Sequence, residues 1–286
     1  GSASVGMWAS RTAGAWGNNL SVSQCPSATA YEEANKTTAT AANVGATVVT
    51  VASATGISAG DIVNFGDEYE YRVISISTND LNIVRKEEPS YYGTTDSSGL
   101  QATITNGAQV RRRWRYYDLF NKAPGTSTYS QQRGGSNDEM HIAVIDEDGG
   151  INGVKGDILE KFEAVSKASD GKSPQGDSNY YSDVIYKSSN YIYWMDHNSS
   201  GSNWGTAAAG TTFTDVTAVS DVSLINGSDG SSATTAQVKS AYELYQDAET
   251  TDVGLLIAGA GDATHIDNLI TIAEKRKDCV VFASPE

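Results

Sequence analysis

Short apolar runs that alternate with polar residues dominate the segment from residue 31 to residue 113. The runs are rich in Val, Ile, Thr and Tyr, and they cover Thr47–Val51, Asp61–Phe65, Tyr69–Ile76 and Leu81–Val84. Strands at roughly ten-residue spacing, separated by turn residues, are typical of small antiparallel barrels or sandwiches. The pattern therefore predicts a small β-domain over residues 31–113. A stretch rich in Pro, Gly, Asp and Ser predicts an exposed loop at 87–107.

The third of these runs carries the clearest alternation. Tyr69, Tyr71 and Val73 share one parity, and Ile74 and Ile76 share the other. Because successive side chains of a strand point to opposite faces, the two sets are expected on opposite faces of the sheet.

From residue 114 onward the periodicity changes. Asp157–Ala168 fits two structures: Ile158, Phe162 and Val165 have the spacing of a helix face, whereas a strand returning from the preceding acidic turn fits nearly as well. The neighbouring patterns are clearer, and they predict a strand at His141–Ile145, a helix at Ser178–Ser189 and a strand at Tyr191–Met195.

The last third of the chain has the order β-α-β. The pattern predicts a helix at Ala236–Gln246, a strand at Val253–Ala258, a helix whose apolar face carries Ile266, Leu269, Ile270 and Ala273, and a strand at Val280–Ala283. A helical crossover implies parallel strands, which are normally covered on both faces. Because the sequence stops directly after such a strand, we expect the natural chain to continue.

Together these patterns predict an α+β fold with two domains. A mixed α/β sheet domain with β-α-β units is expected from residues 1–30 and 114–286, and an inserted antiparallel β-barrel or sandwich from residues 31–113.

Charge and composition narrow the classes of partner. The 286 residues carry a formal net charge of −15, which disfavours non-specific binding to nucleic-acid phosphates and to anionic membranes. No apolar stretch approaches the roughly 20 residues that a spanning helix needs. Cys25 and Cys279 are a weak disulfide signal, and Cys279, at the start of an apolar run, is expected to be a buried thiol.

Several motifs raise the question of chemistry, and each also has a structural interpretation. Gly259-Ala260-Gly261 lies between a strand and a helix, where a phosphate could bind, but Thr264 stands where the Rossmann fingerprint has its third glycine. Asp146–Gly150 could offer carboxylates to Ca²⁺, yet it lacks the spacing of an EF-hand loop. We favour a strand-to-helix loop and a solvated hairpin turn.

The remaining candidates are weaker still. His141, His197 and His265 have no metal-type spacing, and no Gly-x-Ser-x-Gly elbow is present. The run Arg111–Tyr117 interleaves cations and aromatic rings, as nucleic-acid binders do, but a return strand whose arginines pair with acidic neighbours fits better. We therefore predict no catalytic, cofactor-binding or metal-binding residues, and no enzyme.

Three segments carry a family resemblance through their order. They are Arg11–Leu20 with its Gly-Ala-Trp-Gly-Asn core, the block from His141–Gly150 to Tyr191–His197, and Arg276–Pro285. In this order they resemble the conserved core of tail sheath subunits of contractile, T4-like bacteriophages. The resemblance covers Arg11–Leu20 and roughly Asp138–Pro285.

The resemblance implies a structural subunit that polymerises with itself around a tail tube on a baseplate and contracts to drive the tube through the host envelope. It implies a virion protein assembled in the bacterial cytoplasm, with the inserted domain projecting outward. This chain alone is expected to fold as a monomer without polymerising. Two alternatives stay open. One is a virion module that binds a host receptor or glycan through the β-domain, with Tyr91, Tyr92 and Trp204 as the suspected contacts. The other is a nucleotide-binding enzyme that uses the Gly259 loop.

Overall fold

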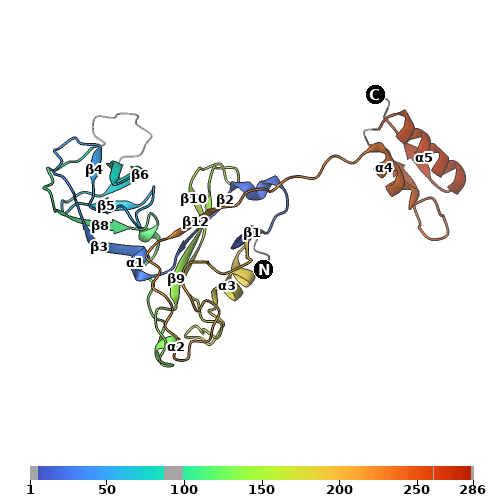
Figure 1. The fold of residues 1–286 in the computed structure, drawn as a ribbon. Coiled ribbons are helices and arrows are strands. Elements are labelled where there is room, and N and C mark those ends of the chain that lie inside the picture. Colours follow the sequence, from blue (N-terminus) through green and yellow to red (C-terminus); the bar gives the residue numbers. More distant parts are fainter. Residues whose placement is uncertain (1–5, 87–98, 260, 285–286) are drawn as a thin grey trace. The chain divides into compact units, whose positions relative to one another are not determined.

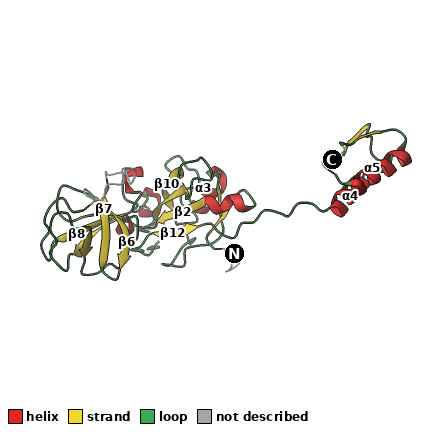
Figure 2. Cartoon of the chain, turned by 90° about the horizontal axis from the view of Figure 1, so that it is seen from above, coloured by secondary structure: helices red, strands yellow, loops and turns green. Residues whose placement is uncertain are grey.

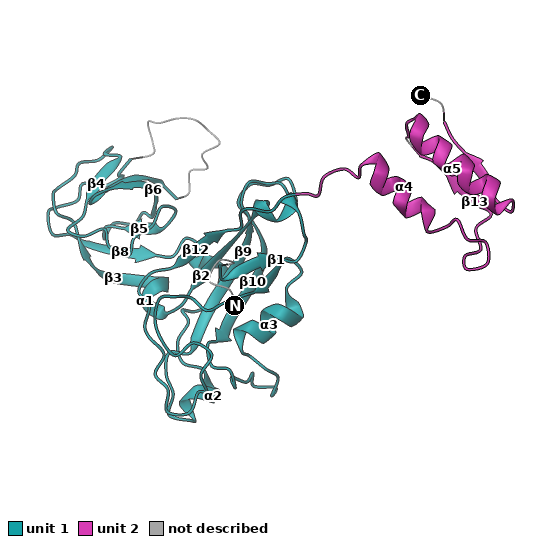
Figure 3. Cartoon of the chain, turned by 45° about the vertical axis from the view of Figure 1, so that its right-hand side comes forward, with its two compact units in different colours: residues 1–228 teal, residues 229–286 magenta. Residues whose placement is uncertain are grey.

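The computed structural model describes residues 6–86, 99–259 and 261–284. The chain divides into two compact units, residues 1–228 (unit 1) and residues 229–286 (unit 2), as Figure 3 shows. The segment 31–113, expected to be an inserted domain, lies inside unit 1, where its strands form a sheet of their own. The described part of the chain contains no helix long and apolar enough to cross a membrane.

The elements of unit 1 begin with the N-terminal strands and end at β12 (Figure 1). In chain order they are β1 (Trp8–Ser10), the 3₁₀ helix η1 (Ala15–Asn19), β2 (Leu20–Cys25), α1 (Ala28–Tyr31), β3 (Glu32–Thr37), β4 (Val48–Thr50), β5 (Ile62–Asn64), β6 (Tyr71–Ser77), β7 (Asp80–Arg85), β8 (Gln109–Arg113), the 3₁₀ helix η3 (Tyr117–Leu119), α2 (Thr128–Gln131), β9 (Glu139–Asp146), β10 (Asp157–Ser166), α3 (Tyr181–Ser188), β11 (Ile192–Trp194) and β12 (Ser220–Ser223).

Unit 2 contains two helices and two short strands. They are α4 (Thr235–Glu243), β13 (Leu255–Ile257), α5 (Ala263–Arg276) and β14 (Val280–Phe282). Figure 2 shows that strands dominate unit 1 and that α4 and α5 make up much of unit 2. The fold is thus α+β with mostly antiparallel sheets, and the predicted β-α-β unit is present as β13-α5-β14, whose strands are parallel. The predicted mixed sheet over residues 1–30 and 114–286 is wrong for the described residues, because these parallel strands form a sheet of their own and the other strands of that range pair antiparallel.

A six-stranded antiparallel sheet spans the segment that was expected to form a barrel or sandwich. Its strand order is β3-β8-β5-β6-β7-β4, and its core gathers fully buried side chains, including Val63, Tyr71 and Leu81. The barrel prediction is wrong in one respect: among the described residues the two edge strands meet only at an isolated bridge between Thr38 and Val51, so the sheet does not close into a barrel.

A β-bulge in β6 makes the predicted face wrong for Ile76. Tyr71 and Val73 are fully buried, and Ile74 is 51% exposed, as the alternation requires. The register against β7 shifts between Val73 and Ser75, which returns Ile76 to the buried side, where it packs on the core. The extra residue of a bulge breaks the two-residue period that the sequence argument assumed.

Strand β9 is the centre of the second sheet, whose order is β10-β9-β2-β12, and all eight of its residues are buried. Met140, Ile142 and Val144 enter one core cluster together with Tyr181 and Ile185 of α3. Ala143 and Ile145 enter another cluster on the opposite side, with Trp114 and Phe120. Both faces of this antiparallel sheet are therefore covered.

The ambiguous segment 157–168 is a strand, β10, paired with β9. The register shifts between Ile158 and Glu160 and again between Phe162 and Val165, and Ala164 at the second shift has φ +52°. Because of these two bulges, Leu159, Phe162 and Val165 pack in one core cluster at three-residue spacing. Ile158, which the helical interpretation placed on the same face as Phe162 and Val165, packs in the cluster on the opposite side of the sheet.

Unit 2 has well-formed helix ends. Thr234 and Gln237 form a capping box at the start of α4, and Asp262 caps α5 by accepting from the His265 N–H at 2.9 Å. Leu256 of β13 is buried against Leu269 and Ile272 of α5. Among the described residues, the face of β13 and β14 away from α5 is open, since Leu255 is 50% and Phe282 is 60% exposed.

Substitution of two isoleucines tests the packing of the six-stranded sheet. Ile83 is 2% exposed and Ile74 is 51% exposed. We expect Ile83→Ala to lower the free energy of unfolding by about 2–5 kcal/mol, because it removes buried methyl groups and leaves a cavity. The control Ile74→Ala should stay within about 0.5 kcal/mol. Urea denaturation measures both, and equal losses would contradict the observed faces of β6 and β7.

Candidate functional site

Arg11, in the first segment of the resemblance, ties the N-terminus of unit 1 to α3 and β11. Its guanidinium donates to the carbonyl oxygens of Ile185 at 3.2 Å and Ile192 at 3.1 Å, and also to that of Tyr186. Its Cζ lies 4.2 Å from the centroid of the Tyr193 ring. A planar fork of five donors can satisfy several carbonyls at once, and we call such a group an arginine clamp.

The glycines of the same segment are required by close contacts. A Cβ on Gly17 would lie 2.6 Å from the Ser10 Cβ. Asn18 holds Gly227 through two hydrogen bonds, each 2.8 Å long, and a Cβ on Gly227 would lie 2.3 Å from the Gly14 carbonyl oxygen. The Gly-Ala-Trp-Gly-Asn run therefore anchors the chain immediately before residue 229, where unit 2 begins.

A second clamp, Arg112 of β8, joins the six-stranded sheet of unit 1 to α1 and to the segment before β12. The residue is fully buried, and its guanidinium donates to the carbonyl oxygens of Thr29 at 3.0 Å and Thr217 at 3.1 Å, and to that of Ala30. Trp114, also fully buried, donates to the Ser23 hydroxyl of β2 at 2.9 Å. The basic run thus fastens the six-stranded sheet to the four-stranded one.

The other cations of the basic run are also paired, as the sequence argument favoured. Arg113 binds Glu32 at 2.7 Å and also Glu70, and Arg111 lies 3.4 Å from Glu32. Arg115 donates to Asp221 of β12 at 2.8 Å. These arginines are engaged with the protein's own carboxylates, which leaves little of their charge for nucleic acid.

Asp61 is the acidic partner inside this junction. It is fully buried, its Oδ2 accepts from the Ser58 N–H at 2.8 Å, and its Oδ1 has no hydrogen-bond partner among the described residues. Burial raises the pKa of Asp61 to about 6, although the nearby Arg112 and Arg115 favour the charged form. The carboxylate is therefore destabilised at neutral pH.

A third clamp, Arg276, organises unit 2 from the last segment of the resemblance. It donates to the carbonyl oxygens of Tyr245 at 2.7 Å and Thr251 at 2.9 Å and pairs with Asp278 at 2.9 Å. The clamp fastens the loop between α4 and β13 to the end of α5.

Contacts within the chain explain the glycine-rich loop. Gly259 has φ +64°, and a Cβ on Gly261 would lie 2.5 Å from the His265 ring, so packing explains this glycine; Ala260 lies outside the described residues. The carboxylate of Asp262 already accepts at the start of α5. An anion at this helix start would meet a negative charge in the place where phosphate binds in dinucleotide folds.

The acidic turn after β9 is closed by backbone donors. The Asp146 carboxylate accepts from the N–H groups of Gly149 at 3.0 Å, Ile151 at 2.9 Å and Asn152 at 2.9 Å. Desolvation raises its pKa, but these donors outweigh that effect and hold the pKa of Asp146 below its usual value. The carboxylate thus shapes the hairpin turn.

The three histidines lie in separate places. His141 bridges the Lys122 carbonyl oxygen at 2.8 Å and the Ala164 N–H at 2.9 Å, and burial lowers its pKa. His197 Nδ1 lies 2.6 Å from the Tyr181 hydroxyl, and His265 Nε2 lies 3.1 Å from the Ala258 carbonyl oxygen. Among the described residues, no three His, Cys, Asp or Glu side chains converge as a metal site requires.

Of the three aromatic residues suspected of exposure, Trp204 lies in the described part of the chain. Trp204 is half-buried; it packs on Tyr181 and donates to the Ser200 carbonyl oxygen at 3.0 Å, so its predicted exposure is wrong. Tyr91 and Tyr92 lie outside the described residues. Both cysteines are free; Cys25 is buried, and Cys279, expected to be buried, is half-exposed.

A buried polar network beside β9 was not predicted from the sequence. The Asp138 carboxylate accepts from the hydroxyls of Ser127 at 2.8 Å and Ser166 at 2.7 Å. Lys167, 1% exposed, donates to the Pro26 carbonyl oxygen at 2.7 Å, and burial lowers its pKa to about 8. The one signal in the sequence is that polar residues interrupt the apolar pattern next to the strands. It does not identify the network, because the residues that bond to each other are distant in the sequence.

Comparison with known proteins gives one informative relative. The chain is 23% identical to the tail sheath protein of Salmonella phage ViI over an alignment 314 residues long. The alignment covers 99% of this chain and 42% of the relative. The chain therefore spans less than half the length of that relative. No protein-family profile matches the chain, and no solved structure matches it.

Protonation of Asp61 should make the stability of unit 1 depend on pH. Its pKa is about 6 in the folded protein and near 3.8 in the unfolded chain, so the folded state binds the extra proton and loses stability as pH rises from about 4 to about 6. We expect Asp61→Asn to stabilise the protein relative to wild type by on the order of 2–3 kcal/mol above pH 6 and progressively less toward pH 4.

Tryptophan fluorescence during urea unfolding measures this difference, because all 5 tryptophans lie in unit 1. Asp148→Asn is the control, since Asp148 is exposed and an asparagine there can still accept from Gly150. A stability difference for Asp61→Asn that is constant between pH 4 and pH 7 would rule out titration of this carboxyl.

A glycine pair tests the anchor at the end of unit 1. Gly227→Ala should lower the free energy of unfolding of unit 1 by about 1–3 kcal/mol, because the new methyl group collides with the backbone at Gly14. Gly230→Ala should have little effect, since a Cβ there meets nothing within 4 Å. The same fluorescence assay compares them, and an unchanged Gly227→Ala variant would show that the Asn18 contact does not anchor the chain.

Proposed function

We propose that this chain is part of the structural subunit of a contractile phage tail sheath. The observation that carries the proposal is the alignment with a tail sheath protein along 99% of the chain. The similarity supports a structural role in a phage virion. The finer proposal is that the subunit polymerises with itself around a tail tube, on a baseplate, and contracts to drive the tube through the host envelope.

The internal use of polar side chains supports a structural role. In the segments that carry the resemblance, Arg11 and Arg276 donate to backbone carbonyls, and Asp146 accepts from backbone N–H groups. A catalytic constellation instead holds such groups free to meet a substrate. We therefore propose that the protein works through the fit between copies and is not an enzyme.

Clamped units suit a mechanism based on rigid bodies. Arg112 and Trp114 link the six-stranded sheet of unit 1 to the four-stranded one from buried positions. Rotation of rigid bodies about remade interfaces is an established route for switching between two packed states. A few kcal/mol per copy, summed over many copies, would supply mechanical work. We propose that the subunit is assembled in the host cytoplasm and stays in the virion.

Immunoelectron microscopy of the virions tests this function. Antibodies raised against purified unit 1 should label the tail along its length in both extended and contracted particles. Antibodies raised against the tube protein should label only tube that contraction has exposed. Label confined to the capsid, the baseplate or free fibres would overturn the sheath proposal.

A further inference from the structure

Unit 2 presents an apolar sheet face that the described residues leave uncovered. Leu255 and Ile257 of β13 are 50% and 62% exposed, and Val280 and Phe282 of β14 are 58% and 60% exposed. The parallel register pairs Leu255 with Val280 and Ile257 with Phe282, so the four side chains form one continuous patch. We call these four residues the open face.

The open face lies opposite helix α5. Leu256 and Val281 alternate with its residues along the two strands, and both pack in the cluster that contains Leu269 and Ile272 of α5. Because alternate side chains of a strand point to opposite sides, α5 covers one side of the two strands and the open face is the other side. Parallel strands are normally packed on both sides by helices.

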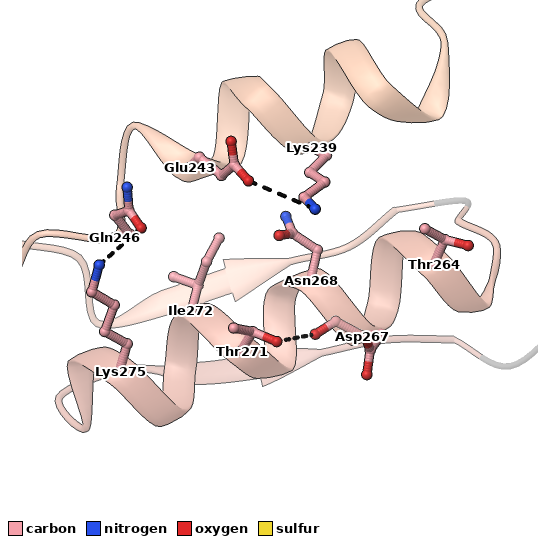
Figure 4. A pocket seen from close by; sticks show the side chains of 9 residues that line it. All are labelled: Lys239, Glu243, Gln246, Thr264, Asp267, Asn268, Thr271, Ile272 and Lys275. Carbon is pink, nitrogen blue, oxygen red and sulfur yellow. Dashed lines mark hydrogen bonds and ion pairs between the residues drawn. The ribbon is translucent and has the colours of Figure 1, made fainter.

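Polar side chains line the groove between α4 and α5, and they distinguish it from the open face. Figure 4 shows Lys239 beside Glu243 and Lys275 beside Gln246. The first pair is 3.9 Å apart, and Lys275 donates to Gln246 at 3.0 Å. Water can hydrogen-bond to the polar side chains of such a groove, whereas exposing four apolar side chains to water is unfavourable. The open face is therefore the side of unit 2 that needs a cover.

The size of the open face decides between kinds of cover. Two residues along a strand span about 7 Å and neighbouring strands lie about 4.8 Å apart, which one helix of about 10 Å diameter would cover. A stable contact between separate proteins buries about 800 Å² per partner, and four half-exposed side chains offer on the order of a few hundred Å². A helix of the same polypeptide fits better than a second copy.

We propose that an amphipathic α-helix from residues of the same polypeptide beyond this chain packs on the open face and completes a helix-sheet-helix layer. The similar Salmonella phage protein has more than half of its length outside the aligned segment, so a polypeptide of that length has the residues to supply the helix. The inference rests on the proposed sheath function only for the existence of this additional length.

Hydrogen exchange measured by mass spectrometry tests the cover. We compare this 286-residue chain with the polypeptide expressed from its whole coding sequence, both at a concentration where they are monomeric. Amides of residues 255–257 and 280–282 should exchange at least tenfold more slowly in the longer polypeptide, because the cover suppresses local opening. Amides of β9 should not change, and they report that unit 1 is folded.

A matched pair of variants of the longer polypeptide locates the contact. Ile257→Lys places a charge on the open face and should abolish the added protection. Ile270→Lys should retain it, because Ile270 is 46% exposed and lies on α5, outside the open face. In the 286-residue chain, Ile257→Lys should reduce the fluorescence of bound anilinonaphthalene sulfonate, whereas Ile270→Lys should leave it unchanged.

Three results would overturn the inference. They are equal exchange in the two polypeptides, protection that rises only with the concentration of the 286-residue chain, and a coding sequence that adds no residues. Protection that rises with concentration would identify a second copy as the cover. Added protection in a protein that never labels the tail would count against the sheath function and leave the helical cover intact.

Discussion

Guanidinium groups that donate to backbone carbonyls are the interaction on which the rest of this structure depends. Arg11, Arg112 and Arg276 each serve carbonyls from segments that are distant in the sequence. A buried carbonyl without a donor costs free energy comparable to a lost hydrogen bond, and irregular segments have no ladder to satisfy it. Arg112 and Arg276 therefore let loops lie against strands and helices without that penalty, and Arg11 joins the N-terminal segment to α3 and β11.

Coverage of sheet faces is the complementary constraint. In unit 1, β9 is buried on both sides because α3 covers one face and the segment around Trp114 covers the other. The cover on the Trp114 side requires the end of the basic run to lie over the sheet. Arg112 makes this possible because it donates to the carbonyl oxygen of Thr29. Among the described residues of unit 2, α5 covers one side of the strands and the other side is open.

The sequence predicts elements where side-chain periodicity matches the backbone period. The strands at 47–51 and 81–84 and the helices of unit 2 follow from simple alternation or helical spacing. β10 was ambiguous and Ile76 was misplaced because bulges change the period. β2 and β12 escaped prediction because Ser23 and Asp221 are polar residues paired with each other, and hydropathy does not register such a pair. The clamps escaped because their acceptors are backbone carbonyls, which no sequence pattern marks.

The clamps also limit where a change of state can occur. Arg112, Arg115 and Lys167 direct their charges inward or toward the protein's own carboxylates, which leaves a surface dominated by the net charge of −15. Like-charged copies repel over about 8 Å at physiological salt, so contacts between them must be gained at short range. Deforming a unit would break buried hydrogen bonds without forming new ones. In the proposed sheath, a rearrangement that preserves the clamps would therefore take place between copies, or at residues 229–234, where the chain has no regular structure.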